Sequence, residues 1–346
     1  MSSLSVPLLV AIFAAAGAGV WAAGVQLSNT TDVLSSRLGL GEALGGLILL
    51  AIATNLPEIA ITASAALQHN LGIAVGNILG GIAIQTVVLV VLDVVAHRGR
   101  PPLTYRAASL QLMLEGALVI AVLVLAIMGT QLPSSLIVGR VAPSGLLIAV
   151  AWVAGIWLLS QARTNMPWHE QGRAPDTSPR PQRPQRTKQS TARAAVVFAG
   201  AALVTLAGGV LLEESGSRIA GHLGMSGVLF GSTVLAAATA LPELSTGLAS
   251  IRLGDDHLAI SDIFGGNAFL PVLFLLAGVL SGSAVLPDAK STDIYLAGLG
   301  ALLTVVYMWG LVMRPARRVL GMGLDSLVVL VLYLVGIGGL VAIAQG

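Results

Sequence analysis

Ten runs of about 20 mostly apolar residues follow one another along this chain, and they constrain its fold more than any other feature. A helix needs about 20 such residues to cross the hydrocarbon core of a bilayer. Only 10% of the residues are charged, against about 25% in soluble domains. We predict an all-α polytopic membrane protein with ten spans, at about 6–28, 42–67, 72–95, 107–128, 144–160, 194–212, 227–251, 258–281, 293–312 and 324–344.

Lysine and arginine gather in alternate connections between these spans, which predicts the orientation of the chain in the membrane. Of the 18 basic residues, only Arg140, Arg218 and Lys290 fall in the other connections. The basic connections are expected to be cytoplasmic, which places both termini outside a cell (inner) membrane. Residues 161–193 are rich in Pro, Arg, Gln and Ser and predict a basic cytoplasmic linker between residues 1–160 and 194–346.

Each half of the chain contains five predicted spans and one copy of a repeated motif. Because five is odd, the second half enters the membrane upside down relative to the first, as in transporters built from inverted repeats. The motif copies lie within about residues 41–86 and 226–271, and matching residues such as Glu58 and Glu243 are 185 positions apart. We expect the copies to meet near the bilayer midplane, where the sites of such transporters lie.

Both copies place a proline and a glutamate inside an apolar span, as Ala53-Thr54-Asn55-Leu56-Pro57-Glu58 and Ala238-Thr239-Ala240-Leu241-Pro242-Glu243. Proline kinks a helix and frees the carbonyl four residues earlier, here that of Ala53 or Ala238. These carbonyls, two threonine hydroxyls and two carboxylates form the oxygen set that hard cations such as Ca²⁺ prefer. A carboxylate this deep in a membrane is expected to bind a cation or a proton.

The doubled motif resembles that of the cation/calcium exchanger superfamily, which includes sodium/calcium exchangers. The superfamily pattern is Gly-Thr-Ser-Leu-Pro-Glu, followed by Gly-Asn-x-x-Gly-Ser-Asn-x-x-Asn. Its second part reads here Gly76-Asn77-Ile78-Leu79-Gly80-Gly81 and Ser261-Asp262-Ile263-Phe264-Gly265-Gly266. The resemblance implies a secondary antiporter, not an enzyme, which needs no cofactor and works by alternating access as the first and sixth helices slide. It also implies that Ca²⁺ is bound by Glu58, Glu243, Thr54 and Thr239.

Several departures from the superfamily pattern bear on the counter-ion. The serine after threonine is Asn55 or Ala240, the serine of Gly-Ser-Asn is Gly81 or Gly266, and the last polar residue is Gln85 or Leu270. These positions resemble those that supply oxygens to Na⁺ in sodium-coupled members. The missing oxygens favour H⁺ over Na⁺ as the counter-ion, while Asn55, Asn77, Gln85 and Asp262 remain candidate ligands.

Other acidic residues have less specific interpretations. Asp262 is either a charge at a helix start or an additional titrating group near the site. Glu115 is expected to bond to Gln111 or to another helix. Asp93 and Asp325 lie near predicted helix ends, where solvated side chains are expected.

The alternatives to a divalent-cation antiporter are an H⁺-coupled or monovalent cation exchanger, a membrane-embedded enzyme and a cation channel. The sequence lacks His-Glu-x-x-His and Gly-x-Ser-x-Gly motifs, which disfavours an enzyme. Channels usually combine several identical subunits, whereas one chain supplies both halves of this site. The expected partners are inorganic cations and the lipid bilayer, with no nucleic acid, and a monomer is expected to suffice for transport.

Overall fold

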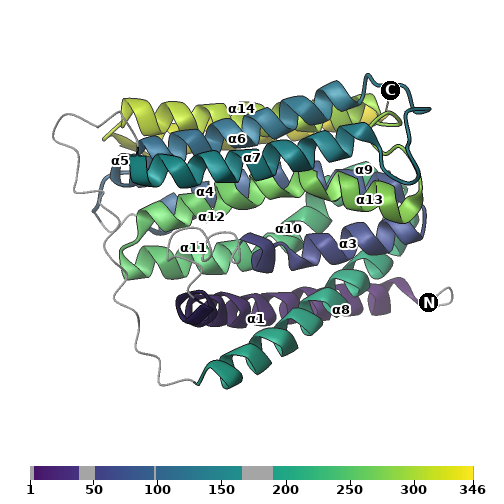
Figure 1. Ribbon diagram of the computed structural model, residues 1–346, viewed down its shortest axis with the longest axis horizontal. Coiled ribbons are helices and arrows are strands. Elements are labelled where there is room, and N and C mark those ends of the chain that lie inside the picture. Colours follow the sequence, from purple (N-terminus) through teal and green to yellow (C-terminus); the bar gives the residue numbers. More distant parts are fainter. Residues whose placement is uncertain (1–3, 39–50, 97–98, 166–189, 346) are drawn as a thin grey trace.

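The structure is a computed structural model that describes residues 4–38, 51–96, 99–165 and 190–345 (Figure 1). The helices of the first half are α1 (Val6–Leu38), α3 (Leu56–Leu67), α4 (Leu71–Val95), α5 (Leu103–Ala107), α6 (Leu110–Gly129) and α7 (Pro143–Asn165). The second half begins with α8 (Thr191–Leu223), α9 (Gly227–Phe230), the π-helix η2 (Gly231–Leu235), α10 (Ala236–Thr239) and α11 (Leu241–Leu253). It continues with α12 (Asp256–Phe269), the 3₁₀-helix η3 (Leu270–Val272), α13 (Leu273–Ser281), α14 (Ser291–Met313), the hairpin β1 (Arg318–Val319) and β2 (Met322–Gly323), and α15 (Leu324–Gln345).

Within the described residues, nine helical segments are long and apolar enough to span a bilayer. The predicted span at 42–67 begins among residues 39–50, which lie outside the described part of the chain. Its described portion is helical at 51–54 and continues as α3. The chain is thus an all-α polytopic membrane protein, as the sequence predicts.

Two helices are longer than predicted, because α1 and α8 continue well past the expected ends at residues 28 and 212. The polar residues in these extensions suggested connections, but the helix satisfies their side chains. Thr31, for example, donates its hydroxyl to the main-chain oxygen of Leu27, one turn earlier, at 2.8 Å. Helix α8 continues to Leu223 and is capped by Gly224, whose φ of 65° lies in the left-handed region that glycine favours.

The helices form layers that run along the long axis of the molecule (Figure 1). Helices α1 and α8 pack against each other on one side, and they contact α11 and α3 respectively. Helices α4 and α12 lie in the middle, and α6, α7 and α14 cover the far side. The two helices that carry the second part of each motif copy are therefore enclosed by the others.

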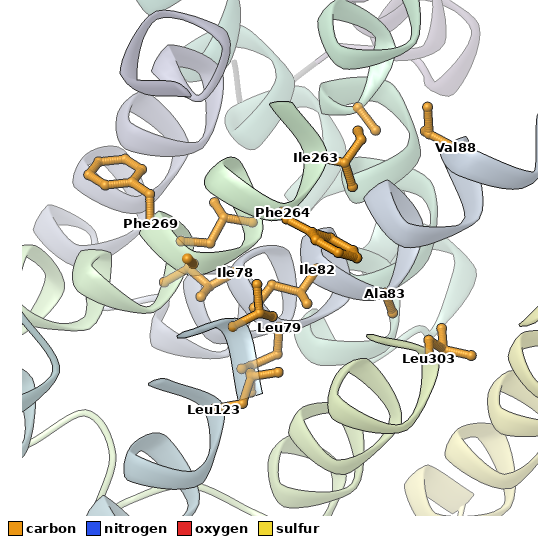
Figure 2. Packing of buried hydrophobic residues seen from close by; sticks show 14 of the residues in the cluster. Ile78, Leu79, Ile82, Ala83, Val88, Leu123, Ile263, Phe264, Phe269 and Leu303 are labelled. Carbon is orange, nitrogen blue, oxygen red and sulfur yellow. The ribbon is translucent and has the colours of Figure 1, made fainter. Parts of the chain in front are cut away.

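The hydrophobic core lies around α4 and α12, with side chains from α6 and α14 (Figure 2). Ile82, Leu123, Phe264 and Leu303 are fully buried there. A helix that is apolar all round is buried by its neighbours, and α4 follows this rule with few polar residues in its central turns. This packing fixes α4 and α12 as the rigid centre of the bundle.

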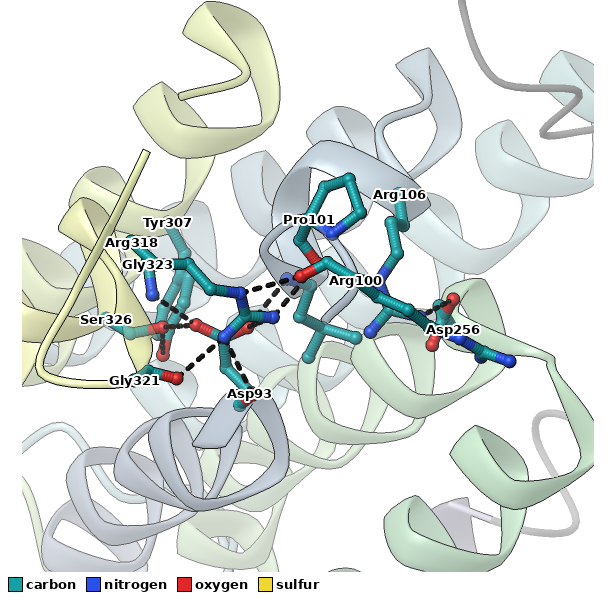
Figure 3. Close-up of polar contacts among 11 residues, drawn as sticks. Asp93, Arg100, Pro101, Arg106, Asp256, Tyr307, Arg318, Gly321, Gly323 and Ser326 are labelled. Atoms are coloured by element: carbon teal, nitrogen blue, oxygen red, sulfur yellow. Dashed lines mark hydrogen bonds and ion pairs between the residues drawn. The ribbon is translucent and has the colours of Figure 1, made fainter. Parts of the chain in front are cut away.

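Asp93 (Figure 3) and Asp325 are buried, with exposed fractions of 1% and 6%, so the expectation of solvated side chains was wrong. The connecting segments fold over the end of α4 and the start of α15, and they supply partners to Asp93. Asp93 accepts hydrogen bonds from the Gly323 amide at 2.6 Å and the Ser326 hydroxyl at 3.0 Å, and it pairs with Arg318 at 3.3 Å. Arg318 also donates to main-chain carbonyls of both connections. These contacts join the end of α4 to the start of α15.

Candidate cation site

The two motif copies interrupt their helices at matching residues. Asn55 forms a turn before α3, and Ala240 forms a turn between α10 and α11. Their backbone angles are similar, with φ −87° and ψ 12° at Asn55 and φ −77° and ψ 1° at Ala240. Pro57 and Pro242 then fall in the first turn of a new helix, where a missing N–H needs no partner. The proline therefore begins a helix, rather than kinking a continuous one as predicted.

Glu58 and Glu243 occupy the first turns of α3 and α11, and neither has any exposed surface. Both face the side chain of Gln85 on α4. The amide nitrogen of Gln85 lies 3.5 Å from Glu58 Oε1 and 3.4 Å from Glu243 Oε1. It also lies 3.5 Å from Oδ1 of Asn55. The carboxylates of the two repeats are thus brought together around a single amide.

Thr54 and Thr239 lie where each can contact the glutamate of the other repeat. Thr239 interacts with Glu58, and Thr54 interacts with Glu243. Each hydroxyl also lies within bonding distance of a carbonyl of its own helix, at 3.3 Å for Thr54 and 3.2 Å for Thr239. A hydroxyl carries one hydrogen. Each threonine can therefore donate to only one of these two partners at a time.

The remaining predicted ligands are distributed unequally. Ala53 and Ala238 immediately precede the two threonines, and their carbonyls cannot accept from the prolines four residues later. Asp262 is buried, accepts a hydrogen bond from Thr246 at 2.5 Å and interacts electrostatically with Glu243. Asn77 is buried, but its amide makes no hydrogen bond to the other predicted ligands.

The two repeats supply different chemistry at the centre. The Gly81 Cα faces the side chain of Leu270, whereas the matching Gly266 faces the side-chain amides of Gln85 and Asn55. A polar amide in the first repeat is therefore matched by an apolar side chain in the second. The departures seen in the sequence make the site asymmetric.

The α1 and α8 helices pack directly on the two motif prolines. A Cβ on Gly24 of α1 would lie 2.7 Å from the Pro242 Cβ. A Cβ on Gly209 of α8 would lie 2.9 Å from the Pro57 carbonyl oxygen and 2.7 Å from the Ala60 Cβ. The two contacts are equivalent, because both the glycines and the prolines are 185 residues apart. Each peripheral helix thus covers the motif of the opposite repeat.

Thr246 and the pair formed by Thr86 and Asn267 were missed by sequence reasoning. The Asn267 amide donates to the Thr86 hydroxyl at 3.1 Å, which links α12 to α4 beside the site. Thr246 follows Glu243 by three residues, so helical periodicity places it on the same face. That spacing is a signal that could have identified it.

A bundle of membrane-length helices, in which inverted halves each contribute a buried carboxylate to one centre, defines a membrane transporter of small cations. The chain belongs to the sodium/calcium exchanger family. The model of this family, described as "Sodium/calcium exchanger protein", matches residues 8–161 and 193–341. Membership of this family makes it a cation antiporter rather than a catalyst.

Similar proteins cover nearly the whole chain. Inner membrane protein YrbG of Escherichia coli (strain K12) is 24% identical over 301 residues, which cover 85% of this chain and 86% of that protein. Putative antiporter CaxA of Alkalimonas amylolytica is 28% identical over 307 residues, which cover 86% and 89%. Among solved structures, the H⁺/Ca²⁺ exchanger CAX matches with a TM-score of 0.64 at 11% identity, over 97% of this chain and 88% of that chain. The sodium-calcium exchanger NCX_Mj also matches with a TM-score of 0.64, at 17% identity and over 96% and 99%.

Proposed function

We propose that this protein exchanges Ca²⁺, or a similar divalent cation, for H⁺ across the cell membrane. The observation that carries the proposal is the meeting of Glu58 and Glu243, both fully buried, around the Gln85 amide. Two carboxylates match the charge of a divalent ion. Buried carboxylates without water need a cation or a proton. Competition between the two at the same glutamates would couple their fluxes in opposite directions.

The oxygen set favours Ca²⁺ over a transition metal. Within the described part of the chain, no three side chains of His, Cys, Asp or Glu gather to hold a metal. A cation at the glutamates would therefore complete its shell with neutral oxygens from Thr54, Thr239 and the main chain, as Ca²⁺ accepts. A shell with only two charges also suits a carrier, because the ion must leave again.

The choice of H⁺ rests on the asymmetry of the site. Leu270 and the glycines at positions 81 and 266 lack the oxygens that would hold Na⁺ beside the glutamates. The Gln85 amide also directs N–H groups toward both carboxylates, where a second cation would otherwise sit.

Alternating access is proposed to occur by movement of α1 and α8 across the other helices. The glycine contacts on Pro57 and Pro242 support it, because small residues let two helices approach closely and slide. The basic connections, which the charge pattern assigns to the cytoplasm, also lie together in the fold. Arg106 pairs with Asp256, and Arg318 bonds to the main chain of Arg100, so three basic connections lie at one end of the bundle (Figure 3).

The test is calcium flux in proteoliposomes with sodium and pH gradients imposed independently. A pH gradient alone should drive saturable calcium counter-transport, and Glu243→Gln should abolish it. Glu115→Gln is the matched control, because Glu115 is also buried in a membrane helix but bonds to Gln111. Flux driven by sodium alone and indifferent to pH would overturn the choice of H⁺. Unsaturable flux without counter-transport would indicate a channel.

A further inference from the structure

Helix α8 buries a carboxylate that the proposed exchange does not use. Glu213 is 1% exposed and lies against α3. Its Oε2 atom accepts hydrogen bonds from the Ser64 hydroxyl at 2.9 Å and from the Gln68 amide at 2.8 Å. The two donors also contact each other at 2.9 Å. Glu213 therefore connects α8 to α3 through a small polar network inside the membrane-spanning part of the bundle.

This network lies along α3 between Glu58 and the end of the helix. Ser64 and Gln68 follow Glu58 by six and ten residues, or about 9 and 15 Å at 1.5 Å per residue. Thr62 lies between Glu58 and Ser64 in the sequence, and its buried hydroxyl has no hydrogen-bond partner. Gln68 is exposed at the end of α3. The polar network of Glu213, Ser64 and Gln68 thus extends to one end of the bundle, which the charge pattern predicts to be the outer face.

Glu213 also lies one helical turn beyond Gly209, where α8 touches Pro57 and Ala60. The hydrogen bonds of Glu213 and the close contact of Gly209 therefore hold the same two helices together on the outer side of Glu58. In the proposed transport cycle, α8 must move relative to α3 before an ion reaches Glu58 from that face. The state of Glu213 then affects how readily this contact opens.

The ligand that fits Glu213 is a proton rather than a metal ion. Both neighbours direct hydrogens at its Oε2 atom, and a metal ion would have to displace both donors. Apart from Glu213, the charged groups near it are Glu214 and Arg218 on α8 itself. The part of α1 that packs here, around Phe13, Ala16 and Val20, carries no charged side chain, and neither do α9 and η2. Helix α3 contributes only Glu58. No set of oxygens comparable to the central site surrounds Glu213.

We propose that Glu213 is a second proton-binding site, separate from the central glutamates, which controls the contact between α8 and α3. When ionised, it holds the helices together through two charge-assisted hydrogen bonds, which are about twice as strong as neutral ones. When protonated, it weakens this contact and eases access to Glu58 from the outer side. The inference rests on the proposed antiport, because movement of α8 is a step of that transport.

The test uses Ca²⁺/Ca²⁺ exchange in proteoliposomes, since this exchange needs no proton gradient. The outer pH is varied while the inner pH is held constant. In the wild-type protein, exchange should rise as the outer medium becomes acidic, until protons compete at the central site. Glu213→Gln should remove this rise and make exchange at alkaline outer pH about tenfold faster, because hydrogen bonds to a charged group are lost.

Two further variants make the result decisive. Glu214→Gln removes the neighbouring charge without touching the Ser64 and Gln68 contacts, so it should keep the rise of exchange in acidic outer medium, shifted to a different pH. Ser64→Ala removes one donor and should raise exchange at alkaline outer pH even if Glu213→Gln fails to fold. A Glu213→Gln profile that superimposes on the wild-type profile, or an unchanged Ser64→Ala, would overturn the inference. Loss of all exchange in the wild-type protein would instead refute the antiport itself.

Discussion

Gly209→Ala is the substitution whose effect follows most directly from the packing of α8 on α3. The added Cβ would lie 2.7 Å from the Ala60 Cβ and 2.9 Å from the Pro57 carbonyl oxygen. Neither obstacle is the end of a flexible side chain, because one is an alanine methyl and the other is main chain. The two helices must therefore separate, at the level of the motif that presents Glu58.

Adding a methyl group to a closely packed contact costs about 1–3 kcal/mol. If this contact forms in one state of the transport cycle and opens in another, the cost falls on the closed state alone. The balance between the states then shifts by about 5- to 150-fold. We expect calcium exchange at alkaline outer pH to become faster by a comparable factor, because this is the contact that the ionised Glu213 also holds closed.

The assay is the initial rate of calcium exchange per reconstituted protein, together with thermal unfolding of the purified protein in detergent. Gly200→Ala is the matched control, since Gly200 lies on the same helix with no atom within 4 Å of an added Cβ. It reports the gain in helix propensity alone, about 1 kcal/mol. Exchange by Gly209→Ala at the rate of Gly200→Ala and wild type would refute the reasoning. So would a loss of exchange fully explained by unfolding.

Two other substitutions test the asymmetric centre and the buried ion pair. Gly81→Ser combined with Leu270→Asn should introduce sodium-driven calcium efflux, since the pair restores two superfamily oxygens where Leu270 now lies 3.2 Å from the position of a Gly81 Cβ. Unchanged sodium independence of that flux would contradict this prediction. Asp93→Asn should lower the free energy of unfolding by about 3 kcal/mol, because Arg318 loses its buried partner. Thermal unfolding in detergent measures this loss, with substitution of the exposed Asp288 by Asn as the control, and equal stability of the two variants would count against it.

The sequence located the two buried glutamates that meet in the bundle better than it predicted the helix lengths. The doubled proline and glutamate are expensive in a bilayer, so their positions indicated a functional centre before any contact was known. The break at Asn55 and Ala240 also follows from proline chemistry. Which donor would stand between Glu58 and Glu243 did not follow, because Gln85 reaches both carboxylates only through the packing of α4.

Polar residues near helix ends were the main source of error. Glu213 and Asp93 lie where the hydropathy pattern weakens, and a weak pattern does not distinguish a solvated side chain from a buried one with partners. Asp93 is buried because two connections distant in sequence fold over it, and Glu213 because α3 supplies its donors. Such partners come from tertiary structure, so hydropathy cannot locate them.

The two helix breaks have an electrostatic consequence. Each break brings the carboxyl end of one helix and the amino end of the next to the centre of the bundle, and the macrodipole gives these ends partial negative and partial positive charge. The amino ends of α3 and α11 soften the repulsion between the carboxylates in the ion-free state. The carbonyl ends before Asn55 and Ala240 attract an arriving cation. The helix ends can therefore stabilise the ionised carboxylates and a bound ion in turn, which suits a carrier that exchanges one ion for another.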